Sequence, residues 1–188
     1  MSLRCIKSEI INELKTDFFI ETGTLSGDGV LYALELGFPN IISIDIDHID
    51  GVYEKFSVHK NVTFIEGDSG ACLWDAIKDK NQKVTFWLDA HGDLIKPSDG
   101  RPWNPVCPVL EELDQIKKHY IKDHYILVDD ITDITKLPGI SKISIEKKIL
   151  EINPNYRICY ADTGGTQTLI ATTNGKDYNS GLFAYRDK

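Results

Sequence analysis

Short apolar runs recur along the chain and alternate with stretches in which apolar residues have helical spacing. A continuous apolar run of a few residues is typical of a strand that is buried on both faces of a sheet. Such runs occupy residues 18–21, 41–45, 62–65, 84–88 and 126–128. Helical spacing occurs at residues 30–34, 73–77, 109–116 and 145–152. Ser69 precedes the second of these stretches and is predicted as its N-cap.

This alternation predicts a parallel sheet, because a strand, a helix and a second strand form a right-handed βαβ unit. The alternation stops at the last two predicted strands, which are residues 157–160 and 168–172. The segment between them contains Gly164-Gly165 and is too short for a crossover helix, so these strands are expected to form an antiparallel hairpin. The 188 residues fit one domain, residues 1–188, with an N-terminal helix in residues 1–16.

Composition and charge narrow the class of protein. The chain is 41% hydrophobic and 27% charged, which is typical of a globular protein. Its net charge of −8 argues against a nucleic-acid partner, since such proteins usually carry a basic face. No apolar stretch approaches the ~20 residues that a membrane-spanning helix needs, and the N-terminus has no apolar signal region. The four cysteines stand alone, as reduced thiols do, and we expect a cytoplasmic protein without membrane contact.

Three aspartates end apolar runs. Asp89 follows the fourth predicted strand, and Asp129 and Asp130 follow the fifth. In open α/β sheets ligands bind at the carboxyl ends of the strands, and carboxylates gathered there repel one another unless a cation joins them. Mg²⁺ or another divalent cation is the usual partner of such carboxylates. The alternative is that all three are solvated acids at strand ends.

Other polar residues follow the first three strands. The first strand runs into a glycine-containing turn that includes Gly23 and Gly27, where the backbone can approach a ligand closely. The dinucleotide fingerprint G-x-G-x-x-G is absent. Asp45 ends the second strand, where a carboxylate can accept the hydroxyls of a ribose. Asp68 and Ser69 follow the third strand, and either of them can hydrogen-bond an adenine edge.

With these signals in this order, nearly the whole chain resembles the class I S-adenosylmethionine-dependent methyltransferases. The resemblance implies a Rossmann-like three-layer α/β sandwich with a seven-stranded, mostly parallel sheet and an antiparallel closing hairpin. It also implies S-adenosylmethionine as the cofactor. The implied cofactor-binding residues are Glu21, Gly23, Thr24, Gly27, Asp45, Asp68, Ser69 and Asp89.

The fourth and fifth strands narrow the resemblance. The segments Leu88-Asp89-Ala90-His91-Gly92-Asp93 and Val128-Asp129-Asp130 look like the metal site of Mg²⁺-dependent O-methyltransferases, of both the catechol and caffeoyl-CoA type and the antibiotic-sugar type. This implies that Asp89, Asp129 and Asp130 are metal ligands. It also implies a small hydroxylated molecule or a sugar as the acceptor.

Two positions depart from the pattern. The lysine that serves as the base in the catechol type is replaced by Gly92, which leaves His91 and Asp93 as candidate catalytic residues, with His91 favoured as the base. The serine expected two residues after Gly27 is Gly29, so one cofactor contact is unaccounted for.

Several alternatives stay open. Residues 93–107 are predicted as a substrate loop in which Trp103 can stack on the acceptor or anchor the loop. Gly92 also fits a methyltransferase-like module that binds S-adenosylmethionine without catalysis. Another metal-dependent α/β nucleotide-binding enzyme is a third reading. The identity of the acceptor and the presence of a homo-oligomer are left open.

Overall fold

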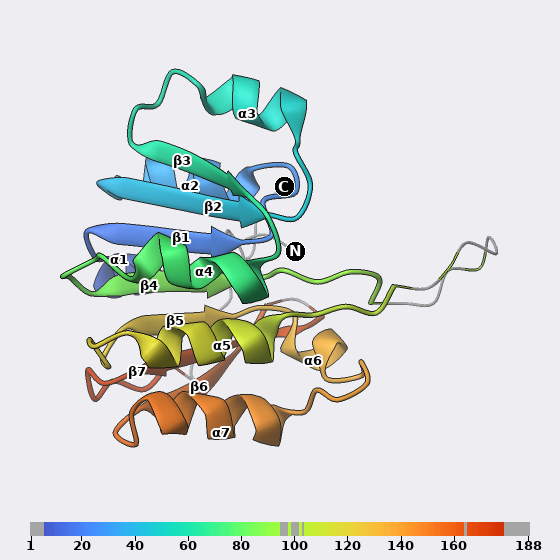
Figure 1. Ribbon diagram of the computed structural model, residues 1–188. Helices are drawn as coiled ribbons and strands as arrows, with labels where there is room; N and C mark the ends of the chain where they lie inside the picture. The colour runs from blue at the N-terminus through green and yellow to red at the C-terminus, as the bar shows by residue number, and fades with distance from the viewer. Residues whose placement is uncertain (1–5, 95–97, 99–101, 103, 164, 179–188) are drawn as a thin grey trace.

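The computed structural model describes residues 6–94, 98, 102, 104–163 and 165–178, apart from the side chain of Asp50. A seven-stranded sheet runs through the centre of the molecule (Figure 1). Its strands are β1 (Phe18–Thr22), β2 (Asn40–Asp45), β3 (Val62–Glu66), β4 (Val84–Leu88), β5 (Tyr125–Val128), β6 (Arg157–Asp162) and β7 (Gln167–Thr172).

The strand order is β3-β2-β1-β4-β5-β7-β6. Strands β1 to β5 pair in parallel, whereas β7 is antiparallel to both of its neighbours, β5 and β6. The predicted hairpin is therefore confirmed. Strand β7, the second strand of this hairpin, is inserted between β5 and β6.

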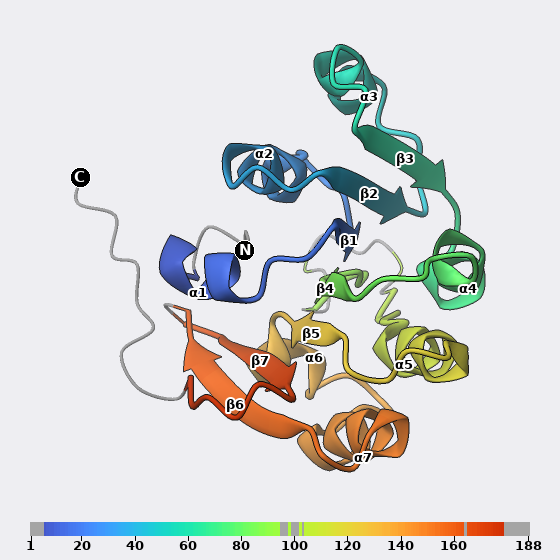
Figure 2. The same cartoon turned by 90° about the vertical axis from the view of Figure 1, so that its left-hand side faces the viewer.

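Helices cover both faces of the sheet. They are α1 (Ser8–Glu13), α2 (Asp28–Glu35), α3 (Asp50–Phe56), α4 (Ser69–Ile77), α5 (Val109–Lys118), α6 (Ile131–Ile134) and α7 (Lys142–Ile152). Figure 2 shows α4, α5 and α7 on one face and α1 and α2 on the other. The predicted Rossmann-like three-layer α/β sandwich is thus confirmed.

Alternation along the strands creates two hydrophobic cores. In β1, Phe19 packs with α1 and α2 residues, whereas Ile20 packs with residues of α4, α5 and α7. In β4, Trp87 packs in the same core as Phe19, and Phe86 packs in the same core as Ile20. Because side chains alternate across a strand, an uninterrupted apolar run supplies both cores at once.

The helix predicted in residues 1–16 appears as α1 within the described part of the chain. Ile11 and Leu14 are fully buried in the core on the α2 side. The carbonyl of Leu14 accepts a hydrogen bond from Thr85 Oγ1 at 2.5 Å, near the beginning of β4. This helix therefore packs on the sheet near the beginning of β4, away from the edge where the strands end.

The carboxyl ends of the central strands are in register. Thr22 of β1 lies opposite Leu88 of β4, and Leu88 lies opposite Val128 of β5. The next residue of each strand, namely Gly23, Asp89 and Asp129, therefore falls in one row at the sheet edge. The loop between β4 and α5 extends from this same edge (Figure 1).

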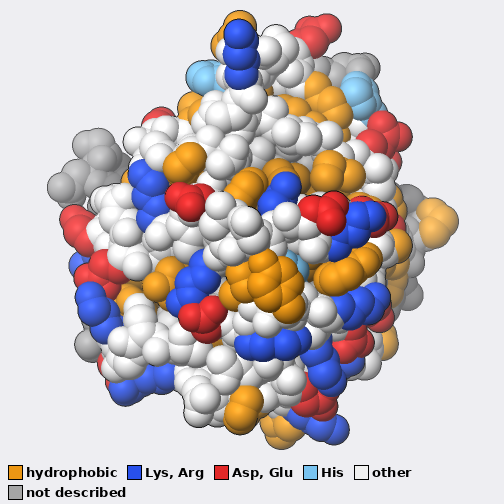
Figure 3. Space-filling view, turned by 60° about the vertical axis from the view of Figure 1, so that its left-hand side comes forward, with side chains coloured by type: hydrophobic (Ala, Val, Ile, Leu, Met, Phe, Trp, Pro, Cys, Tyr) orange, Lys and Arg blue, Asp and Glu red, His pale blue; other side chains and the backbone are white. Residues whose placement is uncertain are grey.

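The opposite side of the molecule, where the strands begin, carries side chains of several types. Figure 3 shows acidic, basic and hydrophobic side chains interspersed on this face. Among the described residues, none of the helices is long and apolar enough to cross a bilayer.

Candidate functional site

Asp89 and Asp129 lie next to each other at the carboxyl edge of the sheet. The Asp89 N–H donates to Thr22 O at 3.1 Å, and the Asp129 N–H donates to Leu88 O at 3.0 Å, so both residues continue the sheet ladder. Each follows a residue whose side chain faces the α4–α5–α7 core. Alternation therefore turns both carboxylates to the opposite face of the sheet edge, side by side.

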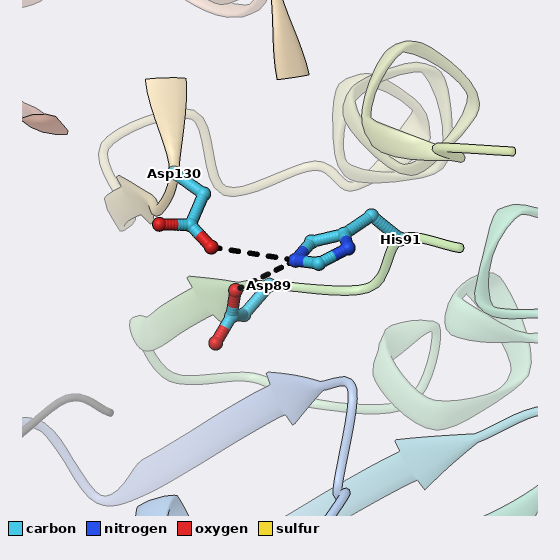
Figure 4. Close-up of side chains that lie close together, drawn as sticks. All are labelled: Asp89, His91 and Asp130. Carbon is cyan, nitrogen blue, oxygen red and sulfur yellow. Dashed lines mark ion pairs between the residues drawn. The ribbon is translucent and has the colours of Figure 1, made fainter. Parts of the chain in front are cut away.

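His91 and Asp130 complete a compact group with Asp89. Asp130 has a left-handed backbone, with φ of 50° and ψ of 30°, which ends β5 and starts α6. His91 Nε2 lies 3.4 Å from Asp130 Oδ2 and 3.8 Å from Asp89 Oδ1 (Figure 4). One ligand atom from each of the three residues falls within 4.8 Å of the others. Two carboxylates and an imidazole at this spacing can hold a metal ion.

Asp129 lies beside the compact group and is not one of its three members. Its Oδ1 accepts a hydrogen bond from Thr168 Oγ1 of β7 at 2.6 Å, while its Oδ2 is buried without a hydrogen-bond partner among the described residues. The compact group contains His91 instead of Asp129. The predicted ligand set of Asp89, Asp129 and Asp130 thus stays a prediction, and the structure adds His91 to it.

Burial and mutual repulsion change the acidity of this group. Burial, and next the charge of Asp129, raise the pKa of Asp89 to about 8. Burial also raises the pKa of Asp129 to about 6. The contact with His91 holds the pKa of Asp130 below its usual range. Burial lowers the pKa of His91, but its contacts with Asp130, Gly92 and Asp89 outweigh burial and raise it. The site therefore favours bound positive charge.

The glycine turn after β1 packs tightly against the same edge. Gly23 has φ of 85°, and a Cβ on it would lie 2.7 Å from the carbonyl oxygen of Asp89. Gly27 has φ of 74°, and its Cβ would lie 2.6 Å from the ring of Phe56. Both positions therefore require glycine for conformation and for space.

Glu21 lies beneath this turn and is 1% exposed. Its Oε1 accepts a hydrogen bond from Ser43 Oγ at 2.6 Å, and Ser43 Oγ also pairs with Thr24 Oγ1 at 2.6 Å. Burial raises the pKa of Glu21 to about 8. A Cβ on Gly29 would lie 1.9 Å from Glu21 Oε2, so a serine at position 29 would force this buried carboxylate to move.

Asp45, the last residue of β2, stabilises the glycine turn that follows β1. Its Oδ2 accepts hydrogen bonds from the backbone N–H groups of Thr24 at 2.8 Å and Leu25 at 3.1 Å, and its Oδ1 accepts from Asp47 N–H at 3.2 Å. An ionised carboxylate can accept about four hydrogen bonds. Backbone N–H groups already donate three of these hydrogen bonds. A ligand that donates two hydrogen bonds to Asp45 therefore has to displace part of the glycine turn.

The third strand end differs from the sequence prediction. Asp68, rather than Ser69, caps α4, because its side chain accepts from Gly70 N–H at 2.9 Å. Ser69 is 4% exposed and donates to Glu112 Oε1 at 2.5 Å. The Ser69 prediction as N-cap was therefore wrong by one residue.

Glu112 was not predicted from the sequence. It lies on α5, is fully buried, and has its pKa raised to about 7 by burial. In the sequence it is an ordinary acid in the first turn of a helix. Nothing local marks it, because its partner Ser69 lies far away along the chain.

The base of the predicted substrate loop forms a paired stem. Gly92 N–H donates to Val106 O at 2.6 Å, and Asp93 N–H donates to Asn104 O at 2.8 Å. Asp93 Oδ2 also accepts from Asn104 N–H at 3.2 Å. A Cβ at position 92 would collide with the carbonyl oxygen of Asn104, so a lysine has no room there. Trp103 lies outside the described residues.

Comparison by sequence gives no relative. No protein-family model matches the chain, and no curated protein matches it.

Comparison by structure gives many matches. A methyltransferase from Aquifex aeolicus that depends on S-adenosylmethionine is 14% identical, with a TM-score of 0.58 over 91% of this chain and 92% of its own. A ribosomal protein L11 methylase from Lactobacillus delbrueckii subsp. bulgaricus is 15% identical, with a TM-score of 0.55 over 88% of this chain and 75% of its own. A Klebsiella pneumoniae protein provisionally named an O-methyltransferase is 13% identical, with a TM-score of 0.55 over 88% of this chain and 76% of its own.

Proposed function

Because the chain has the fold of S-adenosylmethionine-dependent methyltransferases, we propose that it transfers a methyl group from S-adenosylmethionine to a hydroxyl of a small molecule. The observation that carries this proposal is the row of polar groups at one sheet edge. The glycine turn and Asp45 lie on the β1–β2 side of this row, and the Asp89–His91–Asp130 group lies on the β4–β5 side. A donor site and an acceptor site therefore adjoin along one edge.

The β1–β2 side fits the adenosine part of the cofactor. Strand ends at which the order reverses are the usual place for nucleotide-like ligands in such sheets. Asp45 is half-buried there and carries backbone N–H groups on both oxygens. We propose that it accepts a ribose hydroxyl, with Asp68 and Ser69 on the adenine side and Gly23 near the methionine part. The matched structures support S-adenosylmethionine through their fold.

The β4–β5 side fits the acceptor. Buried carboxylate oxygens without a hydrogen bond are costly, and Asp89 Oδ1 and Asp129 Oδ2 both have no hydrogen-bond partner among the described residues. A divalent cation satisfies such oxygens, and the residues present therefore fit one. When bound, a divalent cation lowers the pKa of a hydroxyl that it contacts.

The residues of the chain have three tasks in this reaction. They align the acceptor oxygen with the sulfonium methyl, exclude water, and take up the hydroxyl proton. The candidates for the base are His91, which belongs to the Asp89–His91–Asp130 group, and Asp93, which lies beside it on the loop stem. One oxygen of Asp93 already accepts a hydrogen bond from Asn104 within this stem. The net charge of −8 favours a small acceptor over a nucleic acid.

Calorimetric titration with S-adenosylhomocysteine tests the donor half. Binding is expected for the wild-type chain, and Asp45→Ala is expected to weaken it roughly 10-fold or more, since a hydrogen bond to a charged group contributes about 1.5–3 kcal/mol. Asp47→Ala is the matched control, because that side chain is exposed and only its backbone contacts Asp45. Absence of binding at millimolar ligand would defeat the cofactor assignment.

Methyl transfer to a panel of catechols and sugars, with and without chelator, tests the acceptor half. Transfer that chelator abolishes supports the proposal. Binding of S-adenosylhomocysteine without transfer to any acceptor indicates instead a cofactor-binding module without catalysis, for which the glycine at position 92 is the structural argument.

A further inference from the structure

The hydrogen bond at one nitrogen of His91 fixes the state of the other. His91 Nδ1 lies 2.9 Å from the carbonyl oxygen of Gly92, and a carbonyl only accepts hydrogen bonds, so Nδ1 carries a hydrogen. In the neutral ring, Nε2 then presents a lone pair. Figure 4 shows that this nitrogen points toward the carboxylates of Asp89 and Asp130.

The Nε2 lone pair and the two carboxylates repel one another, so this arrangement is stable only with a positive charge between the imidazole and the carboxylates. That charge is either a proton on Nε2 or a bound cation. A charge-assisted N–H···O bond spans about 2.7–2.9 Å, and the observed separations of 3.4 Å and 3.8 Å are both longer. By contrast, ligands at the corners of a tetrahedron with metal bonds of about 2.0–2.1 Å lie about 3.4 Å apart. The spacing thus fits a shared metal ion better than a shared proton.

Two unpartnered oxygens provide independent support. Asp129 is 2% exposed, and its Oδ2 is buried without a hydrogen-bond partner among the described residues, as is Asp89 Oδ1. The hydrogen bond from Thr168 to Asp129 Oδ1 fixes the direction of the other oxygen. A cation beside Asp89 satisfies oxygens that the protein itself leaves unpaired.

We propose that Asp89, His91 and Asp130 bind a first-row transition-metal dication such as Mn²⁺, Fe²⁺, Co²⁺ or Zn²⁺, with His91 Nε2 as a ligand. Mg²⁺ prefers a shell made of oxygen atoms, whereas imidazole suits transition metals. His91 is then a metal ligand and not the base. The role of the metal rests on the proposed function, but its binding is measurable without methyl transfer.

The surroundings of His91 match those of a ligand histidine. Such histidines usually donate their second N–H to a carboxylate or a backbone carbonyl, which fixes the orientation of the ring. Here the acceptor is the Gly92 carbonyl, and Gly92 is itself held by the hydrogen bond from its N–H to Val106 O at 2.6 Å. The loop stem therefore holds the ring in place.

Titration of the metal-free full chain with Mn²⁺, Co²⁺, Zn²⁺ and Mg²⁺ tests this proposal. His91→Ala is expected to lower the affinity for the transition metals at least ~10-fold. Loss of a group that merely hydrogen-bonds a metal ligand already lowers metal affinity by about 10–100-fold, and loss of a ligand should cost no less. Its Mg²⁺ affinity is expected to stay unchanged. His48→Ala is the matched control, because His48 also pairs with a carboxylate, that of Glu66 at 3.4 Å, but on the exposed surface. It should bind every metal as the wild type does.

A spectroscopic measurement makes the test independent of the variant. Electron spin-echo measurements on the Mn²⁺-loaded wild type should show coupling to a histidine nitrogen, and labelling histidine with ¹⁵N should change that coupling. Equal transition-metal affinity in wild type and His91→Ala, absence of nitrogen coupling, or no metal binding at millimolar concentration would each overturn the proposal. Metal binding without binding of S-adenosylhomocysteine would contradict the proposed function and leave this inference standing.

Discussion

Glu21 is a carboxyl group with almost no contact with solvent, directly beneath the glycine turn. Its hydrogen bonds come from Ser43 and from the backbone of Val30. Its raised pKa means that folding holds a proton that the unfolded chain releases at neutral pH. The turn that we assign to the cofactor is therefore supported by an acid that is neutral at neutral pH.

We expect Glu21→Gln to remove part of the pH dependence of folding. The folded pKa of about 8 lies above the ordinary 4.5, so the stability from this group is complete below pH 4.5 and is lost as the pH rises toward 8. Wild type should lose up to about 1.4 kcal/mol per pH unit relative to Glu21→Gln in this window. The amide fits, because its oxygen can face Val30 N–H while its NH₂ group donates to Ser43.

Urea unfolding of both chains between pH 4 and pH 9 measures this difference. Below pH 4.5 the two free energies of unfolding should run parallel. A constant difference across the whole range would show that Glu21 is ionised in the folded protein.

The strands were predictable within one or two residues because each contains a short apolar run, which in β1, β2, β4, β5 and β7 is largely buried. Helices α3 and α6 were not predicted. The 4 residues of α6 are too few to show a helical period, and among the described side chains of α3 only Phe56 is buried. At the site, the positions of Asp45, Asp89 and Asp129 followed from strand ends alone. The partners of Glu21, Ser69 and His91 did not, because they depend on packing between distant segments and on a left-handed turn at Asp130.

Two buried histidines join α5 to the beginnings of β4 and β5. His124 Nδ1 accepts from Val84 N–H at 3.1 Å, and His124 Nε2 lies 3.1 Å from His119 Nδ1. His119 Nε2 in turn lies 3.0 Å from the carbonyl oxygen of Lys80. Since Lys80 O only accepts, the neutral pair donates along one direction, from His124 to His119 to Lys80.

This pair predicts a loss of stability in acid. Burial, and next the charge of His119, lower the pKa of His124 to about 3 from the ordinary 6.5. The folded state excludes a proton that the unfolded chain binds, so stability is complete above pH 6.5 and falls as the pH drops toward 3. Urea unfolding between pH 7 and pH 4 should show this loss, and His124→Asn should show a shallower one. The same slope in both chains would contradict the prediction.

The cofactor and metal halves lie on different strands of one sheet, and this arrangement makes them separable. The residues assigned to the cofactor lie on strands β1 to β3 or directly follow them, and the backbone of Asp89 and Ala90 packs against Gly23. Strands β4 and β5 carry the carboxylates and His91. The two halves adjoin where β1 pairs with β4, and at the edge of the sheet the Asp89 N–H donates to Thr22 O.

We expect Asp129→Asn to weaken metal binding while the affinity for S-adenosylhomocysteine changes less than ~3-fold. Asp129 follows β5, which lies two strands or roughly 10 Å from β1, and changes at that separation usually act independently. Asparagine keeps an oxygen for the hydrogen bond from Thr168 and removes the charge. Paired calorimetric titrations with metal and with S-adenosylhomocysteine measure both effects. Loss of both affinities together would indicate that the two halves form one coupled site.

The insertion of β7 between β5 and β6 has a consequence for synthesis. Chains emerge from the ribosome N-terminal end first, at about 5–20 residues per second. Strand β5 therefore appears before its partner β7, with a fully apolar edge that nothing earlier in the sheet can pair. Within the described part of the chain, β6 pairs with β7 alone, so it cannot join the sheet earlier either. Until Gln167–Thr172 has emerged, the nascent chain exposes an unpaired edge of the kind that chaperones protect from aggregation.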